Sequence, residues 1–156
     1  MRWLLILWLY AGTVGLLTAQ SEPFTGYWRG VITQDEGGFR PEYGMELYLI
    51  QKGDKVTGRT FVYFENVYAE MELEGEVLAG KILQFRGTKI TAAITRRAAT
   101  ARAIRVEGME WCLKQAVLTL MKTGDPWRLE GAWNGATSFG PCIPGKILLR
   151  KGIPRA

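Results

Sequence analysis

The sequence has 156 residues, of which 47% are hydrophobic and 22% are charged, and it carries a formal net charge of +5 with no histidine. This length suits one domain with a substantial core, and the mild positive charge does not by itself indicate a nucleic-acid partner. The absence of histidine excludes Ser-His-Asp and Cys-His catalysis and every metal site that uses histidine.

The first nineteen residues have the pattern of a secretory signal peptide. A positive start at Met1-Arg2 precedes an uncharged run from Trp3 to Leu17, and Ala19 is a small residue at the expected cleavage point. The run is shorter than the roughly 20 residues that a membrane-spanning helix needs. We therefore expect a signal peptide over 1–19, and one domain over 20–156 that is exported to the periplasm or the medium and has no transmembrane span.

Short segments in which apolar and polar residues alternate follow one another through the rest of the chain, and glycine-containing turns separate them. The turn at Gly53-Asp54 fits a two-residue hairpin. We predict strands over 26–33, 43–51, 56–64, 68–77, 81–86, 109–121, 127–133 and 146–151.

One motif occurs near both ends of this row of strands. The segments Gly26-Tyr27-Trp28-Arg29-Gly30 and Gly131-Ala132-Trp133-Asn134-Gly135 both read G-x-W-x-G. This layout suggests a sheet whose first and last strands meet. Eight antiparallel strands joined by short turns can close into an up-and-down barrel without free edges. We therefore predict an all-β fold, an eight-stranded antiparallel barrel.

The pattern resembles the calycin barrels of the lipocalin and avidin type. In lipocalins a G-x-W motif opens the first strand, its tryptophan plugs one end of the barrel, and a basic residue of the last strand packs across the ring. Gly26 and Trp28 match this motif, and we assign Arg150 to the basic position. The order from M-E-L-x-L-x-Q-K-G through W-C-L-K to C-x-P-G-K-I-x-L also resembles small exported proteins of Gram-negative envelopes, which implies the barrel and a cysteine pair but no activity.

The chain has two cysteines, Cys112 and Cys142. Export leads to an oxidising compartment, where two cysteines commonly pair. The alternatives are two free thiols or a metal pair, although a zinc site would need carboxylates to complete its ligands because the chain lacks histidine. We expect a disulfide, and we expect neither a metal nor a cofactor.

A row of glutamates lies on one face of the predicted strand 68–77. These residues, Glu70, Glu72, Glu74 and Glu76, could bind a cation. Side chains that project in parallel from one strand do not converge as cation ligands do. We interpret them as a solvated outer face.

The segment 89–106 breaks the strand pattern, because it is rich in alanine and arginine. A short helix, an irregular strand pair or a loop would each fit it. Its basic patch, Arg96, Arg97, Arg102 and Arg105, could meet phosphate groups. No aromatic residue is interleaved there to stack on bases, so we expect no nucleic-acid partner and interpret the segment as a solvated loop.

Five apolar side chains are candidates for lining a ligand cavity: Trp28, Trp127, Trp133, Met45 and Met71. The same residues could fill the interior, because an eight-stranded barrel can be packed solid or hold one small ligand. We expect no enzyme, since Ser21 and Ser138 lie in terminal or loop contexts without a neighbouring base and no phosphate-binding glycine loop precedes a helix.

Two functions fit these observations. The first is a barrel that binds a small apolar or amphipathic molecule in an open interior. The second is an interaction protein with a filled interior, such as an inhibitor of an envelope hydrolase, that contacts an envelope protein through loops 35–40 and 135–143.

Overall fold

Nine strands follow one another in the computed structural model, which describes residues 22–65, 67–95 and 110–153. They are β1 (Gly26–Thr33), β2 (Glu42–Lys52), β3 (Lys55–Phe64), β4 (Val67–Leu78), β5 (Ile82–Thr95), β6 (Leu113–Met121), β7 (Arg128–Thr137), β8 (Gly140–Pro141) and β9 (Gly145–Gly152). Lys52 pairs with Lys55, which confirms the two-residue hairpin at Gly53-Asp54. The predicted signal peptide, 1–19, lies outside the described residues.

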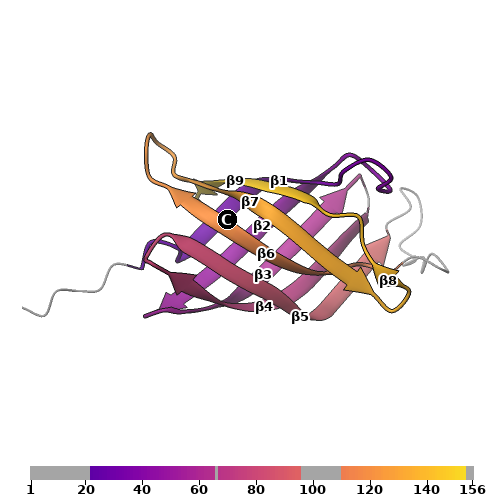
Figure 1. Cartoon of the computed structure of the whole chain (residues 1–156), viewed down its shortest axis with the longest axis horizontal. Helices are drawn as coiled ribbons and strands as arrows, with labels where there is room; N and C mark the ends of the chain where they lie inside the picture. The colour runs from indigo at the N-terminus through magenta and orange to yellow at the C-terminus, as the bar shows by residue number, and fades with distance from the viewer. Residues whose placement is uncertain (1–21, 66, 96–109, 154–156) are drawn as a thin grey trace, which may run out of the picture.

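The strands form a closed antiparallel barrel, as predicted. Their order is β6-β5-β4-β3-β2-β1-β9-β7, and pairing of β6 with β7 closes the ring of eight. The two residues of β8 pair only with β7. Figure 1 shows the strands crossing the barrel obliquely, with β8 at one end and the start of the described chain at the other. In the part of the chain described here, no helix is long and apolar enough to cross a membrane.

Inward side chains fill the middle of the barrel. The alternation in each strand places apolar residues inside and polar residues outside, and the resulting core is continuous. Its largest fully buried side chains are Trp28, Phe24, Ile32, Met45, Leu47, Met71, Leu83, Leu118, Leu129, Ile147 and Leu149. The candidate lining residues Met45 and Met71 therefore lie in a packed core.

One glycine of each G-x-W-x-G motif lies where the backbone of a neighbouring strand approaches closely. A Cβ atom on Gly30 would lie 2.1 Å from the carbonyl oxygen of Leu148, and one on Gly131 would lie 2.0 Å from that of Val117. Any larger residue would push the adjacent strand away. The motif is thus needed for closure of the barrel as well as for placing its tryptophans.

Strand β5 is longer than the sequence predicted, because it continues beyond residue 86 to Thr95. Two register shifts against β4, between Glu70 and Met71 and between Glu72 and Leu73, interrupt its alternation. Thr88 and Thr91 donate hydroxyl hydrogen bonds to the Glu72 and Glu70 carbonyl oxygens there. The loop interpretation was therefore wrong for 89–95. These residues form a strand, and its bulges interrupt the alternation by which a strand is recognised in a sequence.

The predicted basic patch falls outside the described residues, as do all of residues 96–109. It comprises Arg96, Arg97, Arg102 and Arg105.

The glutamate row lies on the outer face of β4, as the alternation predicted. Three of its members form ion pairs with basic residues of neighbouring strands. These pairs are Glu70 with Arg59, Glu74 with Arg86 and Glu76 with Lys55. Among the described residues, no group of three or more acidic, cysteine or histidine side chains is arranged to hold a metal ion.

Candidate functional site

One end of the barrel is plugged by Trp28. Its indole Nε1 donates a 2.8 Å hydrogen bond to the carbonyl oxygen of Phe24, which is itself fully buried in the segment before β1. Lys151 of β9 lies over the ring, 5.2 Å from its centroid, and donates a 2.8 Å hydrogen bond to the Pro23 carbonyl oxygen. The ring centroid of half-buried Trp127 lies 5.1 Å from the same Lys151 Nζ. These contacts seal this end.

The basic residue across Trp28 is therefore Lys151, and our assignment of Arg150 was wrong. Trp28 is the direct register partner of Lys151 in the pairing of β1 with β9. Arg150 is the next residue along the strand, so its side chain points to the outer face, where it is exposed. A register difference of one residue separates the two assignments.

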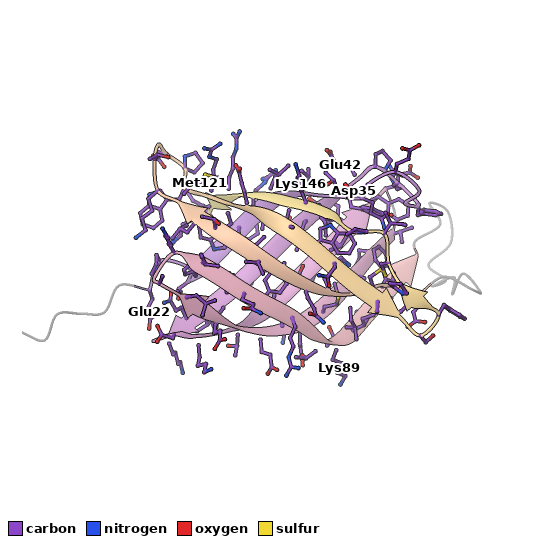
Figure 2. The ribbon with its side chains drawn as sticks, viewed as in Figure 1. Glu22, Asp35, Glu42, Lys89, Met121 and Lys146 are labelled. Carbon is purple, nitrogen blue, oxygen red and sulfur yellow. A yellow bond between two sulfur atoms is a disulfide. The ribbon has the colours of Figure 1, made fainter. Side chains whose placement is uncertain are left out.

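The opposite end of the barrel holds a pocket of about 250 Å³. In Figure 2, Asp35 of the loop between β1 and β2 and Glu42, the first residue of β2, lie at this end, whereas Glu22 and Met121 lie at the sealed end. The pocket is lined by Ile32, Gln34, Phe39, Tyr43, Val62, Glu110, Trp111, Cys112, Lys114, Trp133, Thr137 and Phe139. Strands β1, β2, β3, β6 and β7, the loops that follow β1 and β7, and the segment before β6 supply these residues, so the site is at the mouth.

Trp133 forms the floor of this mouth. It is 3% exposed, and its indole Nε1 donates a 2.7 Å hydrogen bond to the carbonyl oxygen of Thr33 at the end of β1. The tryptophans of the two G-x-W-x-G motifs therefore occupy opposite ends of the barrel, and each is fixed by a backbone carbonyl. Trp28 closes its end of the barrel, whereas the pocket lies above Trp133 at the other end.

Lys114 is the one buried charged side chain among the described residues, with 4% of its surface exposed. Its Nζ donates a 3.2 Å hydrogen bond to the Cys112 carbonyl oxygen and lies 5.5 Å from the Trp133 ring centroid and 6.0 Å from that of Trp111. Burial lowers the pKa of Lys114 to about 8. No carboxylate of the described residues forms an ion pair with it.

Sequence reasoning missed Lys114, although the alternation of β6 contained the signal. Lys114 is in phase with Ala116, Leu118 and Leu120, all of which point inward. A lysine in phase with core residues indicates either a strand end that reaches solvent or a buried cation. In this barrel it is a buried cation at the base of the pocket.

The rim of the pocket carries a carboxylate that is already hydrogen-bonded. Glu110 accepts a 2.9 Å bond from the Ser138 backbone N–H and a second bond from the Ser138 hydroxyl. Both bonds lower the pKa of Glu110. The sequence predicted no base beside Ser138, which was wrong, because the pairing of two distant segments brings this carboxylate to it. A carboxylate with a lowered pKa is nevertheless a weak base.

A disulfide joins Cys112 to Cys142, as predicted, with an S–S distance of 2.00 Å. It connects the segment before β6 to the loop between β8 and β9. Cys112 also lines the pocket, and its carbonyl oxygen is the acceptor for Lys114. The disulfide thus holds the wall of the pocket on which the lysine depends.

Of the five candidate lining residues, the structure places only Trp133 in the mouth pocket. Trp28, Met45 and Met71 are fully buried in the core, and Trp127 lies at the sealed end. The two loops expected to carry an interaction surface do meet at the mouth, where they contribute Phe39, Thr137 and Phe139 to the pocket.

The chain matches no protein-family model, and no curated protein or solved structure is significantly similar to it.

Proposed function

We propose that the chain is an exported barrel that binds one small apolar or amphipathic molecule at its mouth. The observation that supports this function is the pocket of about 250 Å³, whose walls include the aromatic rings of Tyr43, Trp111 and Trp133. Ligand sites are typically concave and mostly apolar, with a few polar groups that orient the ligand. Because the middle of the barrel is filled, the ligand occupies the mouth rather than a central cavity.

Export belongs to the same proposal. The signal-like pattern of residues 1–19 and the disulfide between Cys112 and Cys142 both support an oxidising compartment of a bacterial envelope. The pairing of Trp28 with Lys151 at the sealed end supports a relation to the lipocalin type of calycin. The proposal includes no catalysed reaction, because the chain has no histidine and Glu110 is a weak base.

The test is a titration of intrinsic tryptophan fluorescence with a neutral apolar probe such as N-phenyl-1-naphthylamine or 1-decanol. We expect saturable binding of one molecule, weakened several-fold in Phe139→Ala. That ring lines the pocket but is 79% exposed, so its removal leaves the core intact. The matched control is Ile153→Ala, which removes an 88% exposed apolar side chain near the opposite end. Binding that is non-saturable, or equally changed by both variants, contradicts a site at the mouth.

A second candidate function is capture of an envelope protein through the loops at the mouth. Phe39 and Phe139 favour it, because these rings are 70% and 79% exposed on two loops at the same end. Exposed aromatic residues are common anchors of protein interfaces. Native mass spectrometry of the protein from its host envelope distinguishes the two functions. An added mass of a few hundred daltons supports a ligand, whereas an added mass equal to a protein, lost in the double variant Phe39→Ala/Phe139→Ala, supports capture.

A further inference from the structure

The ammonium of Lys114, which borders the mouth pocket, has fewer hydrogen-bond acceptors than donors. An ammonium has three N–H donors, and the described residues offer Lys114 one hydrogen-bond acceptor, the Cys112 carbonyl oxygen. The faces of Trp111 and Trp133 offer a weaker electrostatic attraction. Buried charges in proteins are normally paired, because an unpaired one has lost its hydration without compensation.

The lysines of the two ends have different surroundings. Lys151 is held between two indole rings and bonded to the carbonyl oxygen of Pro23, within a sealed end. Lys114 instead borders a hollow large enough for a ligand. A negatively charged group that enters this hollow can accept hydrogen bonds that the barrel leaves unmade. A charge-assisted hydrogen bond to an ammonium is among the stronger polar contacts in a protein.

We propose that the ligand of this pocket is an amphipathic carboxylate, whose carboxylate binds the Lys114 ammonium and whose apolar tail lies against the aromatic walls. This inference rests on the proposed function, which it makes more specific. Lys114 is then the residue that makes the pocket select ligands with a negatively charged head group.

The rim limits how much negative charge the ligand can carry. Glu110 lines the same pocket and is held ionised by its hydrogen bonds to Ser138. A second negative charge on the ligand would be repelled by this carboxylate, so a monoanion fits the site better than a doubly charged phosphate monoester. The ligand thus meets a cation at the base and an anion at the rim.

The size of the pocket limits the tail. Its volume of about 250 Å³ is slightly below the roughly 300–1,000 Å³ that is typical of small-molecule sites. A tail of medium length therefore fills the pocket, and its free end reaches the exposed rings of Phe39 and Phe139. Decanoate is a suitable probe.

The experiment compares decanoate with methyl decanoate and decylammonium, below their aggregation concentrations, by competition with the neutral fluorescent probe N-phenyl-1-naphthylamine. The three molecules share a tail and differ in the charge of the head group. We expect the wild type to bind decanoate about tenfold or more tightly than the ester, and decylammonium most weakly. Equal binding of decanoate and ester contradicts the inference but leaves the proposed function standing, whereas no binding of any probe contradicts both.

Variants assign the preference to one side chain. Lys114→Met keeps the volume and removes the charge, so it should bind methyl decanoate within about threefold of the wild type and lose the preference for decanoate. Lys122→Met removes an exposed lysine at the sealed end and should keep the preference. A preference that survives in Lys114→Met overturns the assignment. Should that variant fail to fold, equal binding of decanoate and methyl decanoate by the wild type still contradicts the inference.

Discussion

The Nζ atom of Lys151 lies 5.2 Å from the centroid of the Trp28 ring, so the last strand of the barrel covers the tryptophan of the first. A related contact occurs at the other end, where Nζ of Lys114 lies 5.5 Å from the centroid of the Trp133 ring. Both indole N–H groups donate to backbone carbonyl oxygens. Lys151 lies between two indole rings in a closed end, whereas Lys114 borders a pocket. The first end is therefore a structural plug, and the second is a candidate site.

Trp28→Phe should lower the free energy of unfolding by about 1–3 kcal/mol, because it removes the indole hydrogen bond to Phe24 and weakens the attraction of Lys151. Urea unfolding measures this loss. Trp127→Phe is the matched control at the same end, and its effect should be smaller since that ring is only partly buried. A loss in Trp127→Phe as large as that in Trp28→Phe would show that Trp28 is not the plug.

Gly131→Ala should destabilise the barrel by about 2 kcal/mol or more, because the added Cβ would lie 2.0 Å from the backbone carbonyl oxygen of Val117. A backbone atom cannot turn aside as a flexible side chain can, so β6 and β7 must separate. The control is Gly87→Ala, whose Cβ would have its nearest neighbour at 3.5 Å. Thermal unfolding of the two variants should give clearly different midpoints, and similar midpoints contradict the role of the motif in closure.

The barrel could be predicted from the sequence because each strand keeps its alternation and most turns contain glycine. The recurrence of G-x-W-x-G then indicated that the first and last strands meet. Strand β5 escaped detection beyond residue 86 because the bulges at Thr88 and Thr91 shift its alternation. The alternation of apolar and polar residues therefore identified the regular strands, and it failed where bulges interrupt the pairing of β4 with β5.

The candidate site was less predictable, because it depends on register and on contacts between distant segments. The choice between Arg150 and Lys151 depends on which residue faces Trp28, and the sequence carries no marker of that register. The bond from Ser138 to Glu110 joins residues 28 positions apart. Lys114 was visible as a charge in phase with the core, but only the three-dimensional arrangement shows that a pocket lies beside it.

Removing the disulfide with Cys112→Ser and Cys142→Ser together should lower the free energy of unfolding by about 3–4 kcal/mol, as the chain-entropy model gives for a separation of 30 residues. Urea unfolding of oxidised wild type and the double variant measures this difference. We also expect weaker binding of an apolar probe, since Cys112 lines the pocket. A variant with wild-type stability would show that the barrel alone holds these segments in place.

Lys114→Met should stabilise the barrel most near neutral pH, and its advantage should shrink as the pH rises. Burial lowers the pKa of Lys114 from 10.5 to about 8, so the unfolded chain binds this proton more tightly than the folded chain. Below about pH 8 both states are protonated, and the wild type bears the full cost of the buried charge, about 3 kcal/mol. From about pH 8 to 10.5 the folded protein releases the proton and this cost disappears.

Urea unfolding of wild type and Lys114→Met across this pH range measures the effect. Comparing the two proteins at each pH cancels the contributions of other groups, such as Tyr27, whose pKa burial raises to about 12. A constant difference between wild type and Lys114→Met would show that the lysine keeps the same pKa in the folded and unfolded states.

The affinity for decanoate should fall as the pH rises above about 8, because the bound carboxylate favours the charged form of Lys114 and raises its pKa. Between the pKa values of the free and the bound protein, each pH unit weakens binding up to about tenfold. The other titratable groups that line the described pocket do not change charge in this range. Hydrogen bonds from Ser138 keep Glu110 ionised, and burial raises the pKa of Tyr43, which stays neutral.

Calorimetry in buffers of different ionisation enthalpy measures the protons taken up on binding. At a pH just above 8, binding of decanoate should be accompanied by uptake of a substantial fraction of one proton per protein molecule, whereas binding of methyl decanoate should cause no proton uptake. Lys114→Met should remove the uptake together with the pH dependence. A carboxylate bound next to a partly deprotonated Lys114 favours its protonated form, so binding must be accompanied by proton uptake. Tight decanoate binding without proton uptake would mean that the carboxylate lies in solvent at the rim.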